Sequence, residues 1–191
     1  MLNRNLYLIK EHVGAFKFNG AYDIMDPESQ AIIGVAKEDP GTLIHILRLL
    51  INKQMLPTKV EISEREGGLP VLVIKRGFSL LRSRVEVEDG HGKLLGYFKS
   101  KLLSIGGGFY VFDARDQQIA EVKGDWKGWN FTFLSGNGLE MGSVSKKWAG
   151  LAKELFTSAD NYVVSIGAGY EAQTPLLLAA ALAIDIVYKE G

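Results

Sequence analysis

The sequence contains no cysteine. This absence excludes disulfide bonds, thiolate metal sites, a thiol nucleophile and S-acylation, and it fits a reducing compartment. Histidine is scarce as well, with three residues in the chain. No spacing among His12, His45 and His91 suggests a metal site, and we expect His91 to be a turn residue in the run Asp-Gly-His-Gly.

The chain also has no net charge, and its sequence shows no signal peptide. Lysine plus arginine and aspartate plus glutamate number 22 each, so the overall charge indicates neither a nucleic acid partner nor an anionic membrane, and only a local cluster of charge could do so. The first residues lack the apolar core and the small-residue cleavage site of a signal peptide. We therefore expect a cytoplasmic protein that binds no nucleic acid.

Long apolar runs are absent except near the end of the chain. The apolar run 175–184 has about half of the 20 residues that a bilayer-spanning helix needs, and Glu171 and Asp185 bracket it, so we expect no transmembrane span. Leucine and alanine dominate residues 175–188, and Pro175 suits a first helical position. Because no polar stripe precedes Asp185, the sequence predicts a core helix that is apolar on every side.

The rest of the chain repeats one pattern that predicts a wall around this helix. Two runs with alternating apolar residues flank a short turn-rich segment, which is typical of a β-hairpin. The pattern occurs five times, at 22–37, 60–75, 85–99, 109–123 and 131–145. A first strand at 6–9 and a last strand at 161–166 bring the total to about twelve. The sequence therefore predicts a mainly β fold, a closed antiparallel barrel wrapped around the C-terminal helix, as one domain over residues 1–191.

Small residues recur at one position in the returning strands of four hairpins: Gly34, Gly96, Ala120 and Gly142. A recurrent small side chain on a strand marks the close approach of another element, and we expect that element to be the core helix. One insertion interrupts the hairpins. Residues 42–53 have the apolar spacing of an amphipathic helix, which either lies on the barrel or caps an open end, or contacts a membrane surface or a partner.

Several segments resemble the phospholipid scramblase family. The run Gly-Ser-Val-Ser-Lys-Lys-Trp-Ala-Gly at 142–150 and the residues that follow it to 162 resemble the C-terminal signature of that family. Residues 74–78, 95–97 and the closing segment 182–190 are similar as well, so the resemblance covers nearly the whole chain. It implies kinship with the plant LURP-one-related proteins and the Tubby C-terminal domain, whose fold is a twelve-stranded barrel around a hydrophobic C-terminal helix. The smaller LURP-one-like form is the closer analogy.

The chain departs from animal scramblases at two features. Those proteins carry a cysteine cluster for palmitoylation and, just before the last helix, an acidic stretch proposed to bind calcium. This chain has no cysteine. Its corresponding stretch, 167–174, has Glu171 as its one carboxylate, whereas a hard cation needs several oxygen ligands. We expect no calcium and no other cofactor.

The main candidate site is a basic face beside an aromatic residue. Its members are Lys75, Arg76, Arg82, Arg84, Tyr97, Lys99 and Lys101. If 89–92 is the loop of its hairpin, Arg82 lies opposite Lys99 and Arg84 lies opposite Tyr97. Directly opposed like charges cost stability, and an anionic head group would use such a face, with about 1 kcal/mol per basic residue at an anionic surface. A solvated barrel face is the alternative.

Two further polar features leave alternatives open. A weaker basic candidate consists of Lys146, Lys147 and Lys153 with Trp148. Asp185, near the end of an apolar helix, either has a partner at the barrel mouth that sets the helix register or has a proton or ligand role.

These observations lead us to expect a non-enzymatic module that docks peripherally on anionic phospholipid or phosphoinositide, since Tubby-type barrels bind phosphoinositides on a basic outer surface. Scrambling of lipids between leaflets, which the resemblance implies, is one alternative. A protein-binding scaffold is another, and a third is a small enzyme with a barrel-mouth pocket near Glu171 and Asp185. For an enzyme, the sequence offers no serine in the context of a nucleophile, and Gly106-Gly107-Gly108 opens no helix that would bind phosphate.

Overall fold

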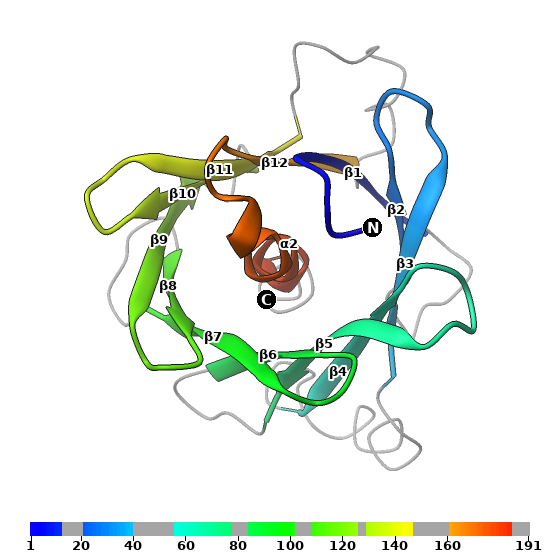
Figure 1. The fold of residues 1–191 in the computed structure, drawn as a ribbon, viewed down its shortest axis with the longest axis horizontal. Coiled ribbons are helices and arrows are strands. Elements are labelled where there is room, and N and C mark those ends of the chain that lie inside the picture. The colour runs from blue at the N-terminus through cyan, green and yellow to red at the C-terminus, as the bar shows by residue number, and fades with distance from the viewer. Residues whose placement is uncertain are drawn as a thin grey trace.

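A computed structural model describes residues 1–12, 21–39, 56–77, 84–101, 108–125, 129–146 and 161–184 of the chain. In these residues, twelve strands form a closed antiparallel barrel in which strands that are consecutive in sequence pair and β1 pairs with β12 (Figure 1). The predicted barrel is therefore confirmed. The strands are β1 Leu6–Glu11, β2 Ala21–Met25, β3 Ile32–Glu38, β4 Thr58–Ser63, β5 Pro70–Arg76, β6 Arg84–Asp89, β7 Leu94–Ser100, β8 Gly108–Asp113, β9 Gln118–Asp125, β10 Asn130–Ser135, β11 Glu140–Ser145 and β12 Asn161–Ile166.

The C-terminal helix runs through the middle of this barrel (Figure 1). A short 3-10 helix, η3 (Glu171–Gln173), leads into α2 (Thr174–Ala183), and a proline stands in its first turn as the sequence predicts. Leu177, Leu178 and Leu182 are completely buried. Since burial of each such side chain stabilises the fold by about 1.5–3 kcal/mol, α2 supplies a large part of the core.

Alternation along each strand separates the two faces of the wall. On β6 and β7, the side chains of Val85, Val87 and Phe98 belong to the core around α2, while the residues between them point outward. The wall therefore has an apolar inner face and an outer face on which polar side chains gather.

All five hairpin turns contain a residue with positive φ, and three of them, β6–β7, β8–β9 and β10–β11, share one hydrogen-bond geometry. In the β6–β7 turn, the Asp89 side chain accepts hydrogen bonds from the backbone N–H of His91 (2.9 Å) and Lys93 (3.0 Å), and Gly92 has a φ of 81°. The β8–β9 turn repeats this pattern with Asp113 and with Asp116, whose φ is 61°. An Asp side chain that accepts backbone hydrogen bonds, followed by a residue with positive φ, closes such a turn with little loss of stability.

A β-bulge follows each of these turns, because the returning strand carries one extra residue. The register shifts leave one residue of each returning strand without a partner: Ile33, Val71, Leu95, Ile119 and Met141. All five pack in or against the core. The bulges therefore bend the wall and add apolar side chains at the same end of the barrel.

The recurrent small residues follow these bulges, and their explanation is only partly the predicted one. A Cβ atom on Gly96 would lie 3.0 Å from Leu176 Cδ2 of the helix, and also less than 3.0 Å from the backbone oxygen of Phe112. At Gly142, however, the nearest obstacle is the backbone oxygen of Ser165 on the neighbouring strand. Approach of the helix is confirmed at Gly96, whereas at Gly142 the closeness of the next strand leaves no room for a side chain.

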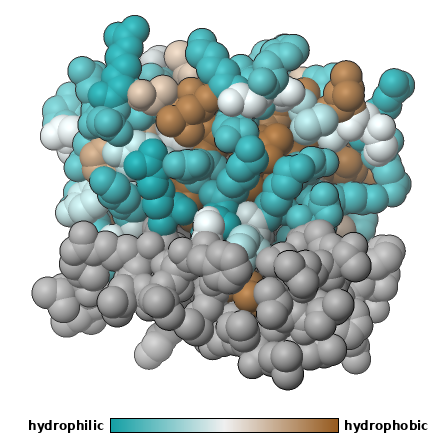
Figure 2. Space-filling model, turned by 90° about the horizontal axis from the view of Figure 1, so that it is seen from below, coloured by the Kyte–Doolittle hydropathy of each residue, from teal (hydrophilic) through white to brown (hydrophobic). Residues whose placement is uncertain are grey.

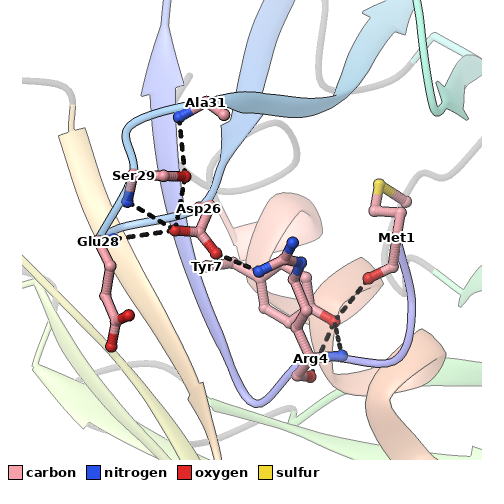
Figure 3. A network of polar contacts seen from close by, with 7 residues as sticks. All are labelled: Met1, Arg4, Tyr7, Asp26, Glu28, Ser29 and Ala31. Atoms are coloured by element: carbon pink, nitrogen blue, oxygen red, sulfur yellow. Dashed lines mark hydrogen bonds and ion pairs between the residues drawn. The ribbon is translucent and has the colours of Figure 1, made fainter.

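The first residues of the chain cross the helix-entry end of the barrel and are held there by polar contacts (Figure 3). Arg4 forms an ion pair with Asp26, and the Tyr7 hydroxyl donates a hydrogen bond to the Arg4 carbonyl at 2.9 Å. Asp26 also accepts hydrogen bonds from the backbone N–H and the hydroxyl of Ser29, and these bonds hold the pKa of its carboxyl below the usual value. The network ties the start of β1 to the β2–β3 turn.

Some predicted features lie outside the described residues. They are the amphipathic helix 42–53, His45, Arg82, Asp185 and the continuation of the core helix to 188.

Candidate anion-binding site

The register of β6 and β7 differs from the predicted one. Arg84 lies opposite Lys99, and Glu86 lies opposite Tyr97. The predicted pairing of Arg82 with Lys99 and of Arg84 with Tyr97 is therefore wrong by two residues. The turn spans three residues between Asp89 and Lys93 rather than four, and the bulge adds the second residue of the shift. The opposed basic pair exists, but its members are Arg84 and Lys99.

An aromatic pair forms the floor of the site. Tyr97 on β7 and Phe112 on β8 are direct cross-strand neighbours, and their rings stack with centroids 4.9 Å apart and planes within 10°. Both point outward, because their neighbours Phe98 and Val111 belong to the core. The side chains of this outer face cover Tyr97, which is 2% exposed.

Arg84 is held flat against this floor. Its guanidinium carbon lies 3.8 Å from the centroid of the Tyr97 ring, and its Nε donates to Glu86 Oε1 at 3.0 Å. Among the described residues, no other group accepts a hydrogen bond from Arg84. A guanidinium fixed by stacking and by its Nε presents its two terminal nitrogens as a fork suited to a phosphate or carboxylate.

Lys99 approaches the same rings from the opposite strand. Its ammonium nitrogen lies 5.2 Å from the ring centroids of both Tyr97 and Phe112. No carboxylate in the described part of the chain forms an ion pair with Lys99, and its side chain is exposed. Arg84 and Lys99 therefore share one aromatic pair, and among the described residues the Lys99 ammonium contacts only these rings.

The phenol of Tyr97 contributes no charge. Burial raises the pKa of this group, and its hydrogen bond to the Asp116 carboxylate raises that pKa further. The hydroxyl therefore stays protonated and donates to Asp116 in the β8–β9 turn, which fixes the ring from its polar end.

Lys101 and Lys75 lie on the same outer face but already have carboxylate partners. Lys101 pairs with Glu121 and lies 4.8 Å from the Tyr110 ring centroid, and this pairing holds the pKa of Glu121 below its usual value. Lys75 pairs with Glu88 at 2.6 Å. They flank the site, and their charge is partly compensated.

Arg76 does not belong to this face. It is 5% exposed, and its guanidinium donates to the Leu56 carbonyl at 3.1 Å and to the Thr58 hydroxyl at 3.0 Å. The prediction that Arg76 and Lys75 share the basic face is wrong, because successive residues of a strand point to opposite faces. Arg76 lies on the same inward face of β5 as the core residues Leu72 and Ile74.

Comparison with known proteins now assigns the chain. A family model described as Scramblase matches residues 3–191. The chain belongs to the scramblase family. Membership indicates a phospholipid-related function. No curated protein and no solved structure gives a significant match.

Only part of the second predicted basic cluster of this scramblase-family chain lies within the described residues. Lys146 lies 4.7 Å from the ring centroid of Trp129, whereas Lys147, Trp148 and Lys153 lie outside the described residues. Trp129 is packed against the core and does not extend the site on β6 to β8.

The described residues contain neither a cluster of metal ligands nor a helix that could span a membrane. No group of three His, Asp or Glu side chains is placed there to hold a metal ion. Glu171, the carboxylate before the helix, accepts a hydrogen bond from the backbone N–H of Gly169 at 3.1 Å, and bonds from backbone N–H groups lower its pKa. No helix in this part of the scramblase-family chain has the length and apolar character needed to cross a bilayer.

Sequence reasoning missed two residues of the site, Phe112 and Glu86. Phe112 occupies an outward position in the alternating run Phe-Tyr-Val-Phe of β8, so an outward aromatic was detectable. Its contact with Tyr97 was not, because that contact depends on the register between β7 and β8. Glu86 was detectable as well, because it lies two residues from Arg84 on the same face of one strand and their ion pair does not depend on the register.

Proposed function

We propose that this scramblase-family barrel is a non-enzymatic module that binds the phosphate of an anionic phospholipid head group from the membrane surface. Arg84 and Lys99 would contact the phosphate, and Tyr97 and Phe112 would form the floor beneath it. The observation that carries this proposal is that two cations share one aromatic pair while the Arg84 fork and the Lys99 ammonium keep donors that no acceptor among the described residues takes up.

Electrostatics favours an anion at this point. Arg84 and Lys99 are directly opposed on neighbouring strands, and like charges in that position repel. A phosphate between them replaces repulsion with two charge-assisted interactions, and the guanidinium fork adds directional hydrogen bonds. The stacked ring and Glu86 already order Arg84, so binding costs little further side-chain entropy there.

Lys101 and Lys75 support the same site at longer range. Each is paired with a carboxylate on its outer face, so each adds less than an unpaired lysine does. Surface attraction of this kind contributes about 1 kcal/mol per basic residue and weakens with salt. We therefore expect reversible, salt-dependent binding.

Cosedimentation with vesicles tests the proposal. The purified protein is mixed with vesicles of phosphatidylcholine alone, of an equimolar mixture with phosphatidylserine, or of phosphatidylcholine containing a phosphoinositide. The substitutions Arg84→Met and Lys99→Met remove charge but keep a side chain over the rings. Each is expected to weaken binding to anionic vesicles about fivefold, and binding should fade as salt rises.

The matched control is Lys93→Met. Lys93 is exposed in the β6–β7 turn, away from Arg84 and Lys99, so this substitution removes the same charge outside the proposed site. Equal losses in all three variants would indicate a general charge effect rather than a site. Unchanged binding in Arg84→Met and Lys99→Met, with thermal unfolding unaltered, would refute the proposed site.

Scrambling of lipids between leaflets is the second candidate, because the matching family model carries that name. The assay follows a fluorescent lipid in reconstituted vesicles and measures how much of it becomes accessible to a membrane-impermeant reductant. The binding module predicts no more accessible lipid than in protein-free vesicles, with or without calcium. Rapid access to the inner leaflet would establish scrambling instead.

A further inference from the structure

The ion pairs between described residues of the barrel wall share one orientation. We call the end formed by the turns 26–31, 64–69, 89–93, 113–117 and 135–139 and by residues 167–171 the hairpin rim, and the opposite end the loop end. In the described part of the wall, every Lys or Arg partner lies nearer the loop end and every carboxylate nearer the hairpin rim. The pairs are Lys37–Glu66, Lys59–Glu61, Lys75–Glu88, Arg84–Glu86, Lys101–Glu121 and Lys123–Glu121.

The hairpin rim itself is acidic. Its basic residues are Arg65, Lys93 and Arg115, and the N-terminal segment that crosses this end adds Arg4, paired with Asp26, and the N-terminal ammonium, paired with Glu64. Its carboxylates are Asp26, Glu28, Glu64, Glu66, Asp89, Asp113, Asp116 and Glu171. Since the whole chain has a formal net charge of zero, the charge is separated along the barrel axis rather than absent.

Hydrophilic side chains extend over much of the wall on the side of β4 to β7 (Figure 2). On these strands the bases nearest the loop end are Lys59, Lys75, Arg84 and Lys99. The proposed phosphate site therefore lies within a band of basic residues at the loop-end half of the wall.

We infer that the barrel docks on an anionic bilayer with the loop-end half of its wall toward the lipid and its hairpin rim pointing away. This orientation rests on the proposed function and adds to it the geometry of the complex. A protein with positive charge at one end of an axis and negative charge at the other is oriented by the electric field of a charged surface.

The dimensions support this orientation. A strand rises about 3.3 Å per residue, so Arg84, at the start of β6, and Asp89, at its end, are separated by about 17 Å along the strand. Because barrel strands tilt by about 35–45°, their separation along the axis is about 12–13 Å, roughly one and a half times the Debye length of about 8 Å at physiological salt. With the loop end down, the rim carboxylates are screened from the lipid; with the rim down, they meet the anionic surface directly.

Exposed apolar residues at the rim or directly next to it favour the competing orientation, with the rim toward the lipid. Leu69, Leu139 and Ile32 are 89%, 58% and 57% exposed. They belong to separate hairpins, and the β10–β11 turn of Leu139 lies across the barrel from the other two (Figure 1). Inserting these tips into lipid would bring the rim carboxylates to the anionic surface, so we expect the rim to stay in water.

Labels at single introduced cysteines distinguish the orientations, because the chain contains no cysteine of its own. His91→Cys places an environment-sensitive fluorophore on the rim, and Lys123→Cys places it on the loop-end half of the wall. Each labelled protein is mixed with equimolar phosphatidylcholine and phosphatidylserine vesicles that contain a quencher lipid. We expect quenching at position 123 and none at position 91.

Reversal of one ion pair is a second test that leaves the proposed phosphate site untouched. The double substitution Lys59→Glu with Glu61→Lys keeps the pair and the net charge but inverts its direction. We expect binding to the same vesicles to fall roughly five- to tenfold, because a base moves away from the lipid and a carboxylate moves toward it. The control Glu28→Lys adds positive charge at the exposed rim and should leave binding nearly unchanged.

The outcomes separate the two proposals. Quenching at position 91, or stronger binding by Glu28→Lys than by the parent protein, would overturn the orientation while leaving phosphate binding intact. Failure of the unlabelled protein to bind anionic vesicles would overturn the proposed function, and this orientation with it.

Discussion

The close approach of β7 and β8 predicts that Gly96→Ala destabilises the barrel. The Cβ atom would lie less than 3.0 Å from the Phe112 backbone oxygen, and 3.0 and 3.1 Å from the two methyl groups of Leu176. The Leu176 side chain can rotate away, but the Phe112 oxygen belongs to the backbone of a strand that is paired on both sides. The added methyl group therefore forces the two strands apart.

The cost follows from two contributions. Overpacking in a filled site typically costs about 1–3 kcal/mol, and a strained ladder hydrogen bond loses about 1 kcal/mol more. We expect the free energy of unfolding to fall by about 3 kcal/mol in total. For a chain of this size, the midpoint of thermal unfolding should then fall by roughly 6–12 °C.

The predicted stability change has the opposite sign to that of a glycine-to-alanine substitution at an unobstructed position. In an unobstructed strand, replacing glycine by alanine is expected to stabilise by roughly 0.5–1 kcal/mol, since glycine loses more conformational freedom on folding. Gly136 in the β10–β11 turn is the matched control, because a Cβ there meets nothing within 4 Å. Thermal and urea unfolding followed by circular dichroism should show a loss for Gly96→Ala and little change for Gly136→Ala.

A double-mutant cycle identifies the obstacle. If the Phe112 oxygen decides the cost, adding Leu176→Ala will not restore the stability of Gly96→Ala. Recovery in the double variant would mean that the helix side chain is the obstacle. Stability of Gly96→Ala equal to that of the parent protein would refute the argument from strand closeness altogether.

Two further predictions concern the core helix and the turns. Leu178→Ala should lower the free energy of unfolding by about 2–5 kcal/mol in urea, because Leu178 is fully buried; Leu69→Ala, at an exposed rim residue, should have an effect below about 0.5 kcal/mol. Backbone N–H groups of Lys93 and His91 hold the pKa of Asp89 below its usual value. Asp89 therefore contributes stability above the ordinary aspartate pKa of about 3.9, and this contribution is lost as pH falls through the lower folded value. Asp89→Asn should flatten the fall of the thermal unfolding midpoint over that acid range, and a curve as steep as the parent's would contradict the assignment.

The local pattern of the sequence was enough to predict the architecture. Alternation over two residues predicts strands, and Asx-rich and Gly-rich turns predict hairpins, because both depend on interactions between near neighbours in the chain. The apolar segment from Pro175 onward predicts a surrounded helix for the same reason. These local signals agree with one another, and a closed sheet is the arrangement that buries such a helix.

The candidate site depended on features that local pattern does not contain. The three-residue turn and the bulge at Leu95 move the register of β6 and β7 by two residues, which exchanges Arg82 for Arg84 opposite Lys99. The stacking of Phe112 on Tyr97 follows in the same way from the β7–β8 register. The inward position of Arg76 is different, because it follows from strand alternation and was therefore detectable from local pattern.

The sequence by itself therefore determined that this chain forms hairpins around an apolar helix, since periodicity and turn chemistry act over a few residues. Only the tertiary structure decided which cations share the Tyr97 and Phe112 rings, and that the wall ion pairs all have their bases toward the loop end. The shared rings depend on the register between neighbouring strands, in which one unpaired residue of a bulge changes every cross-strand contact beyond it. The ion pairs that join different strands, such as Lys75–Glu88, depend on that register too.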